Sequence, residues 1–125
     1  EHAMEHPLSA YHPEVPHGAG LIMISRAYFT FLIEHCPALG ERYIAMARAM
    51  GREDAKDPMD FITALVELQA KCGVADLKMS DYGIQPEEFP TFAQNARSTM
   101  GILFGLDRIE LSDADLVTIY QQSYR

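Results

Sequence analysis

The chain has 125 residues, which is enough for one compact domain and too few for two domains with separate hydrophobic cores. Ten basic residues against eighteen acidic ones leave a formal net charge of −8, so the chain lacks the positive surface by which proteins bind nucleic acid or anionic lipid. Hydrophobic residues make up 48% of the sequence, which is typical of a folded globular protein. With two cysteines, no secretory signal and no apolar run long enough to span a bilayer, we expect a reduced, cytoplasmic protein.

Prolines and glycines divide the first half of the chain into three predicted helices. Residues 1–11 are expected to be helical, with Pro7 as a kink or a stop, and two further prolines then make an extended loop. A long helix is expected over about 17–35, and because it is apolar almost all round we expect it to be central. The third helix covers about 38–50, with Gly51 in the position that follows a helix C-terminus.

A fourth helix is predicted over about 57–73. Asp57 is a favourable N-cap, Pro58 a favourable first helical residue and Gly73 a favourable terminator. The apolar residues that share one face of this helix are Phe61, Leu65, Leu68 and Cys72. Both Cys36 and Cys72 are expected to be small buried residues rather than nucleophiles, because neither has a histidine nearby in the sequence to activate it.

Two further helices complete the predicted fold. In one of them Pro86 and Pro90 both fit helix starts, so we expect a short turn and then a helix to about Met100. A loop at 101–105, which begins and ends with glycine, is expected to follow. The other is expected over about 112–123, where Ser112 and Asp115 form a capping-box pattern. No segment alternates between apolar and polar residues as a strand would. The predicted fold class is therefore all-α, a compact domain of about six helices.

Four of the five histidines lie in the first 17 residues, and three of them have a context that suggests metal binding. His2 and His6 are four residues apart, so on a helix they face the same side and can share one metal ion. His17 stands at a helix start in a Pro-His-Gly-Ala-Gly sequence, where glycines leave room for a ligand. His12 and His35 lack such a context and are expected to be ordinary surface residues. From spacing alone the metal pair is His2 and His6, and the alternative is a pair of surface histidines.

Two stretches near the N-terminus carry a more specific signature. Residues 2–11 are HAMEHPLSAY and residues 15–21 are VPHGAGL, with three histidines, a His-Pro and a Pro-His-Gly in that order. This arrangement closely resembles the signature of the iron-containing (group III) alcohol dehydrogenases. A weaker resemblance continues downstream, where residues 81–84 are DYGI, residues 111–113 are LSD and residues 119–120 are IY. The resemblance thus covers nearly the whole chain, but only its first 21 residues are diagnostic.

The resemblance implies a role for each of the three histidines. By position, His2 and His17 correspond to ligands of a divalent metal, Fe²⁺ or Zn²⁺. His6 corresponds to a histidine beside the metal and the nicotinamide, with a catalytic and cofactor-positioning role. The implied reaction interconverts a small primary alcohol and its aldehyde with NAD(P). In it the metal polarises the alcohol or carbonyl oxygen for hydride transfer.

The resemblance also implies that residues 1–125 are most of the helical C-terminal metal-binding domain, truncated at its N-terminus. The family's other two ligands, an Asp and a His, and its Gly-rich pyrophosphate loop have no counterpart in the sequence. The nucleotide-binding domain is therefore expected to be absent and the chain alone inactive. The expected partners are a small alcohol or aldehyde and a second copy of the chain in a homo-oligomer, with no nucleic acid and no membrane. Two alternatives stay open: a helical interaction module, and a stand-alone helical metal-binding protein that uses His2, His6 and His17.

Overall fold

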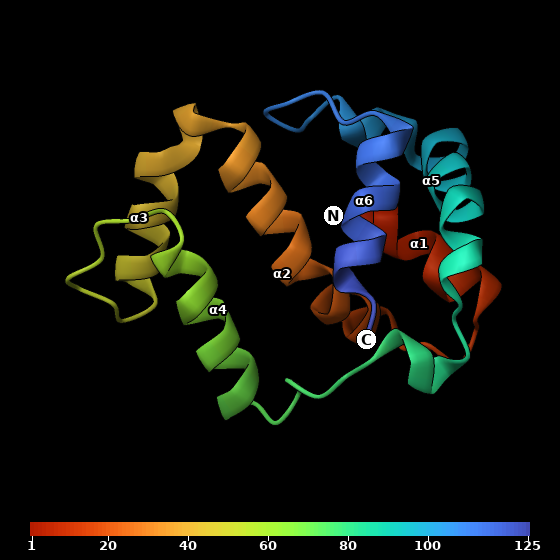
Figure 1. Ribbon diagram of the computed structural model, residues 1–125, viewed down its shortest axis with the longest axis horizontal. Coiled ribbons are helices and arrows are strands. Elements are labelled where there is room, and N and C mark those ends of the chain that lie inside the picture. The colour runs from red at the N-terminus through yellow and green to blue at the C-terminus, as the bar shows by residue number, and fades with distance from the viewer.

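Six α-helices and three short 3-10 turns form the computed structural model, which describes all residues 1–125 and contains no β-strand (Figure 1). The predicted all-α class and number of helices are confirmed. The helices are α1 (His2–Tyr11), α2 (His17–His35), α3 (Gly40–Ala49), α4 (Asp60–Lys71), α5 (Phe89–Phe104) and α6 (Asp113–Ser123). The 3-10 turns are η1 (Pro37–Leu39), η2 (Met79–Tyr82) and η3 (Pro86–Glu88). None of the helices combines the length and the apolar composition needed to cross a lipid bilayer.

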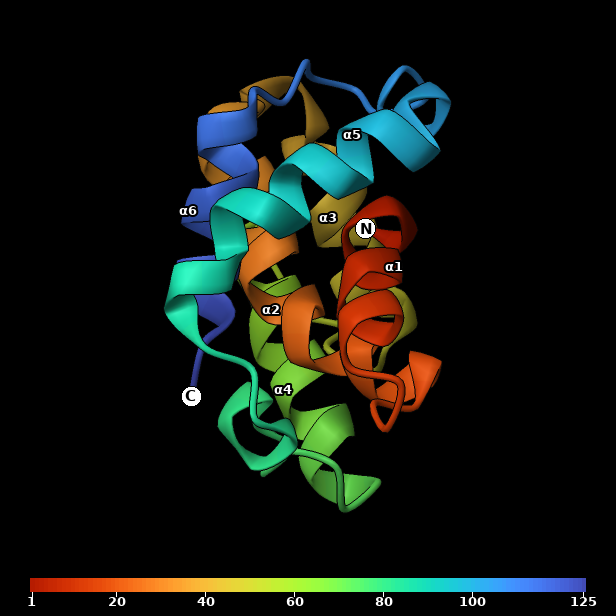
Figure 2. The ribbon, with the colours of Figure 1, turned by 90° about the vertical axis from the view of Figure 1, so that its right-hand side faces the viewer.

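Helix α2 lies in the middle of the molecule, as its apolar surface predicts. In Figure 1, α3 and α4 pack together on one side of α2, and α1, α5 and α6 lie on the other. Figure 2 shows α5 crossing close to α1, and these two helices share the most extensive contact of the fold. Buried hydrophobic residues from all six helices join in one connected core. The chain is therefore a single packed unit in which α2 contacts both sides.

Helix α1 continues through Pro7, which was expected to act as a kink or a stop. A proline inside a helix lacks an N–H group for the preceding turn and costs about 3 kcal/mol. The helix nevertheless continues because Met4 and Leu8 are fully buried in the core. The hydroxyl of Tyr120 in α6 also donates a hydrogen bond to the backbone carbonyl of Met4. These contacts fix α1 so that the side with its two histidines faces solvent.

Helix α4 begins later than predicted because two aspartates organise the turn before it. The carboxylate of Asp57 accepts a hydrogen bond from the backbone N–H of Met59 at 2.8 Å. The carboxylate of Asp60 accepts from the N–H groups of Asp57 and Lys56 at 3.0 and 2.9 Å. These two hydrogen bonds, Asp57's first, hold the pKa of the Asp60 carboxyl below its ordinary value. The predicted end of the helix is confirmed, since Gly73 adopts a positive φ of 71° just after it.

The buried face of α4 differs from the predicted one. Phe61 is buried, as expected, but the other buried residues are Ile62 and Ala64. Leu68, by contrast, is 47% exposed. The remaining members of the predicted stripe, Leu65, Leu68 and Cys72, line an open apolar cavity between α2 and α4. The periodicity places the predicted residues on one face, but the core lies on the side of the helix with Phe61, Ile62 and Ala64. There the Phe61 ring contacts Phe29 of α2 and Tyr43 of α3.

Helix α5 extends beyond its predicted end. Residues 101–105 were expected to form a loop, yet the helix continues to Phe104, with a local kink where Met100 has φ −128° and ψ 21°. Gly101 does not adopt the positive φ by which a glycine ends a helix. Phe104 is buried, and the guanidinium of Arg97 lies 4.6 Å from the centre of its ring. The burial of Phe104 in the core accounts for the continuation of the helix past the glycine.

Candidate metal centre

The three predicted site histidines meet where α1 and α2 join. His2 and His6 lie one turn apart on the exposed side of α1, and His17 is the first residue of α2. The turn between the two helices brings His17 back against α1. The ring centres of His2 and His17 are 5.4 Å apart, and those of His6 and His17 are 5.7 Å apart with the planes at 88°. The structure therefore places these residues together, although 15 positions separate the first from the last.

The spacing of the rings fits a shared metal ion. Two imidazoles bound to one tetrahedral ion, with metal–nitrogen bonds of about 2 Å, have ring centres about 5 Å apart. Both His2 and His6 lie near this distance from His17, so ring spacing alone does not choose between them. The chain contains no group of three or more His, Cys, Asp or Glu side chains arranged to hold a metal ion. Its histidines can thus supply only part of a ligand set, and the roles of His2, His6 and His17 stay predictions.

A buried carboxylate, which the sequence analysis did not single out, supports the cluster. Glu5 lies on the buried face of α1, fully enclosed, between the two exposed histidines of that helix. Its Oε1 accepts a hydrogen bond from the Ser9 hydroxyl, and its Oε2 contacts Nδ1 of His17. Oε2 has no hydrogen-bonding partner besides His17. The arrangement is a carboxylate–imidazole pair, in which His17 is half exposed and Glu5 lies beneath it.

The signal that could have revealed Glu5 is its position in the helical pattern. Met4 and Leu8 define the apolar face of α1, and Glu5 falls on that face rather than on the solvent side. An acidic residue on a buried face requires a partner, because an unpaired buried charge is costly. The sequence does not name this partner, since the contact depends on the turn that returns His17 to α1.

The other two histidines take no part in this cluster, as predicted, but one of them is not an ordinary surface residue. The His12 side chain is only 15% exposed, and its Nε2 lies 3.0 Å from Oε1 of Glu88 in η3. Burial opposes ionisation of Glu88, but hydrogen bonds from the backbone N–H of Gln85 and from His12 hold its carboxyl pKa below the ordinary value. His12 therefore ties the end of α1 to the start of α5. His35, at the far end of α2, is exposed and stacks on Phe31.

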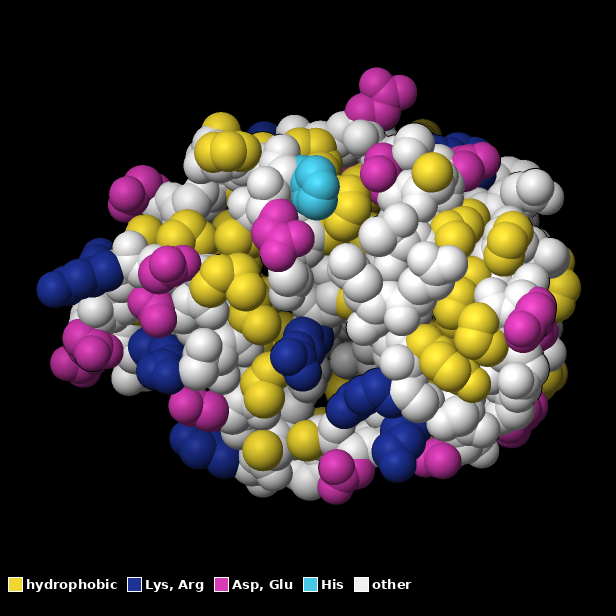
Figure 3. All heavy atoms as spheres, viewed as in Figure 1, with side chains coloured by type: hydrophobic (Ala, Val, Ile, Leu, Met, Phe, Trp, Pro, Cys, Tyr) yellow, Lys and Arg dark blue, Asp and Glu magenta, His cyan; other side chains and the backbone are white.

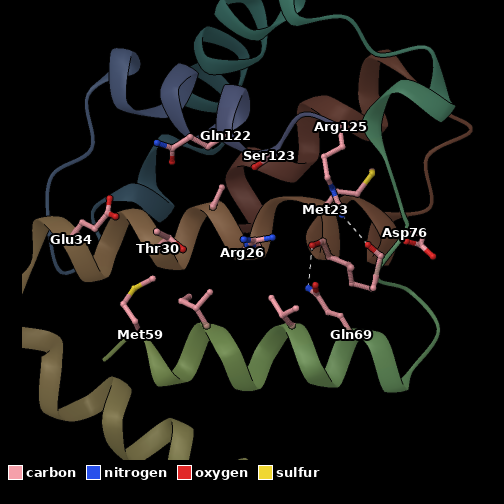
Figure 4. A pocket seen from close by; sticks show the side chains of 15 residues that line it. Met23, Arg26, Thr30, Glu34, Met59, Gln69, Asp76, Gln122, Ser123 and Arg125 are labelled. Atoms are coloured by element: carbon pink, nitrogen blue, oxygen red, sulfur yellow. Dashed lines mark hydrogen bonds between the residues drawn. The ribbon is translucent and has the colours of Figure 1, made fainter. Parts of the chain in front are cut away.

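The cavities of the chain lie away from the histidines. The largest, of about 590 Å³, opens between α2, α4 and the C-terminal residues, with Arg26, Gln69 and Arg125 among its polar lining (Figure 4). Figure 3 shows the corresponding hollow with basic side chains around it. Another cavity, of about 350 Å³, is almost wholly apolar and includes Leu21 and Phe29 of α2. We place the candidate site at the histidines because three imidazole rings gather there, whereas the larger cavity contains no histidine.

Comparison with known proteins identifies the family. The sequence model for the C-terminal part of the Fe-containing alcohol dehydrogenase family matches residues 1–124. The chain is 31% identical to the long-chain primary alcohol dehydrogenase AdhA of Thermoanaerobacter ethanolicus, over 98% of this chain and 31% of that protein. The resemblance seen in the first 21 residues is therefore confirmed along the chain.

Solved structures agree with this family. Two crystal structures of ADH/D1, an archaeal halo-thermophilic alcohol dehydrogenase from a Red Sea brine pool, match this fold with TM-scores of 0.86 and 0.84. One was solved bound to NZQ and the other is a histidine-to-alanine mutant. Each is 27% identical to this chain and is matched over 98% of this chain and 32% of its own length. The chain thus spans about a third of the length of these relatives. It belongs to the iron-containing alcohol dehydrogenase family and corresponds to the C-terminal part of that family's proteins.

Proposed function

We propose that this chain supplies part of the metal centre of an NAD(P)-linked alcohol dehydrogenase that interconverts a primary alcohol and its aldehyde. The observation that carries the proposal is the meeting of His2 and His17, with ring centres 5.4 Å apart, in a chain of the iron-containing alcohol dehydrogenase family. The metal is Fe²⁺ or Zn²⁺, both of which imidazole nitrogen binds. The relative AdhA is named for primary alcohols, which supports the substrate class.

Each histidine has a distinct part in this proposal. His2 and His17 hold the ion through ring nitrogens. A divalent ion bound there supplies Lewis acidity to the oxygen of the alcohol or aldehyde. His6 is exposed and its ring lies edge-on to that of His17. We assign it a place beside the ion, where it would not be a ligand. From that position its ring nitrogens can contact the nicotinamide or carry a proton between the substrate and water.

The proposal requires contributions from outside the chain. The cluster has no three side chains arranged to hold a metal ion, and the chain has no Gly-rich strand–turn–helix motif for a pyrophosphate. We therefore assign the remaining metal ligands and the nucleotide-binding domain to the part of the relatives' length that this chain does not match. The 125 residues alone are expected to show no alcohol oxidation.

The test is a set of single substitutions in the protein that carries this chain together with the nucleotide-binding part. His17→Ala should remove the metal and the activity together, because a ligand is lost. His6→Ala should leave the metal bound and lower turnover by about 10²–10⁴-fold, as loss of an acid–base group does. Elemental analysis and the absorbance of NAD(P)H measure the two effects. His35→Ala, at the far end of α2, is the control and should change neither.

A reversed pattern would contradict the assignment of roles. If His6→Ala strips the metal while His17→Ala retains it, His6 rather than His17 is the ligand. If neither substitution changes the metal content, the ion does not bind at this cluster.

A further inference from the structure

The buried carboxylate beneath the histidines has no part in the function proposed so far. Glu5 is the only charged residue of the chain that is fully buried. A buried charge destabilises a protein unless it is paired and hydrogen-bonded. Both oxygens of Glu5 are engaged, one by the Ser9 hydroxyl and the other by Nδ1 of His17. Ser9, Glu5 and His17 therefore form one hydrogen-bonded group that joins two helices. His17, its most exposed member, is a candidate metal ligand.

We propose that Glu5 is a positioning residue that selects the nitrogen with which His17 binds metal. An ionised carboxylate can only accept a hydrogen bond, so its contact with Nδ1 places the ring proton on Nδ1. The neutral imidazole then has its free lone pair on Nε2, and the ring is oriented by the same contact. His17 is thereby held as an Nε2 ligand before any metal arrives. That Nε2 binds a metal ion rests on the proposed function. The orientation and tautomer of His17 do not depend on it.

A glycine makes the approach of the carboxylate possible. A Cβ added at Gly20 would lie 2.7 Å from both Cγ and Oε1 of Glu5, closer than real side chains come. A Cβ added at Gly18, two residues earlier in the same helix, would have no atom within 4 Å. Of these two glycines after His17, the structure therefore requires only Gly20 to lack a side chain. The carboxylate occupies the space that any other residue would fill.

The contact separates His17 from the two histidines on α1. His2 and His6 are exposed, and neither ring has a nitrogen in contact with a carboxylate oxygen, as His17 does. Their rings can turn and present either nitrogen. Only His17, on the neighbouring helix, is held by a buried group. Glu5 thus gives the site one ligand of defined orientation.

The tautomer of His17 in the metal-free chain tests this inference directly. Nitrogen NMR of ¹⁵N-labelled histidine, recorded about two pH units above the ordinary imidazole pKa of about 6.5, distinguishes the two ring tautomers. We expect His17 to show the Nδ1–H form in the native chain and in E5Q, because the Gln oxygen can still accept from Nδ1–H. In E5L, His17 should become a mixture of both tautomers. His35 is an internal control, since its Nδ1 lies 2.8 Å from the carbonyl of Phe31, away from Glu5.

A matched pair of glycine variants covers the case in which E5L does not fold. G20A retains every polar group but displaces the Glu5 carboxylate, so the Nδ1–H form of His17 should lose population. G18A should leave the tautomer as in the native chain, because nothing lies near the added methyl group. Circular dichroism and thermal unfolding confirm that the variants compared are folded.

A Zn²⁺ titration of the same variants connects the tautomer to metal binding. It is made in the protein that carries this chain together with the nucleotide-binding part, so that the remaining ligands are present. Zn²⁺ should perturb the Nε2 signal of His17, and E5L should weaken the Zn²⁺ affinity by about 10–100-fold, the usual effect of losing a group that orients a ligand. E5Q should weaken it by less.

Several results would overturn the inference. They are a native tautomer for His17 in folded E5L or G20A, loss of the tautomer in folded E5Q, and binding of Zn²⁺ through Nδ1 of His17. If the tautomer responds as expected but Zn²⁺ perturbs neither His2 nor His17, the proposed metal centre is wrong. The positioning of His17 by Glu5 is then still established, because it was measured without metal.

Discussion

The two sides of α2 are packed very differently. On the side of α1, α5 and α6, the rings of Phe89, Phe92 and Tyr120 are fully buried and contact one another. None of the largest fully buried side chains comes from α3 or α4. Beside α4 the chain leaves cavities of about 590 and 350 Å³. The cavity of about 380 Å³ on the other side lies at the end of α5 and the loop after it, and none of these three rings lines it. The same central helix therefore borders a close-packed region and a loosely packed one.

The histidine cluster belongs to the close-packed region. His2 and His6 are carried by α1, which packs against α5, and His17 is held against Glu5 of α1. A metal site needs its ligands within about 0.5 Å of their working positions, and only residues whose support cannot move provide this. We infer that the close-packed region of α1, α5 and α6 (the tight side) holds the histidines in position. Substitutions in the region of α3 and α4 (the loose side) should leave the histidines undisturbed.

The largest expected effect is on stability, from removal of one ring on the tight side. Phe92→Ala should lower the free energy of unfolding by about 3–5 kcal/mol, because it leaves a cavity in a core that cannot collapse around it. Urea denaturation measures this loss. Phe29→Ala, the matched change on the loose side, should cost less, since Phe29 already lines an open cavity. An equal or larger loss for Phe29→Ala would show that the two sides do not differ in packing energy.

A smaller effect is expected at alkaline pH from Tyr120. Burial, with a further contribution from the negative charge of Glu5, raises the pKa of Tyr120 far above its ordinary value of about 10. Above pH 10 the unfolded chain loses this proton while the folded chain retains it, so stability falls by about 1.4 kcal/mol per pH unit from this group.

Tyr120→Phe sharpens this prediction. At neutral pH it should cost about 1 kcal/mol, through loss of the hydrogen bond to the Met4 carbonyl. Above pH 10 its stability should fall less steeply than that of the native chain. Unfolding curves at a series of pH values measure both effects. An unchanged alkaline slope would mean that the Tyr120 hydroxyl ionises within the fold.

The smallest effect on stability is expected on the loose side. The apolar seam formed by Leu21, Phe29, Leu65 and Leu68 is uncovered in this chain, so we expect the chain to self-associate. Leu68→Glu should change the free energy of unfolding by no more than about 0.5 kcal/mol and should weaken the association. Light scattering over a concentration series measures the association.

Ile102→Glu is the control for this last prediction. Ile102 is exposed on α5, outside the seam, and its substitution should leave the association unchanged. A native chain that stays monomeric at high concentration would contradict the prediction, as would equal effects of the two substitutions.

Much of the fold could be predicted because helix boundaries depend on local chemistry. The positive φ angles of Gly51 and Gly73 and the reciprocal hydrogen bonds of Ser112 and Asp115 follow from residues within a few positions of one another. The end of α5 could not be predicted in this way. There the burial of Phe104, a tertiary contact, outweighs the tendency of Gly101 to end a helix.

For the candidate site, too, some features follow from the sequence and others only from the tertiary structure. The sequence by itself determined the all-α class and the family, and it singled out the three histidines as candidate site residues. All of these depend on residue types at fixed spacings. Only the tertiary structure decided that Glu5 lies beneath His17 and that Gly20 makes room for it. It also decided that Leu68 lines an open seam instead of the core. The physical reason is that periodicity shows which residues share a face of a helix, whereas the packing of the other helices decides what that face meets.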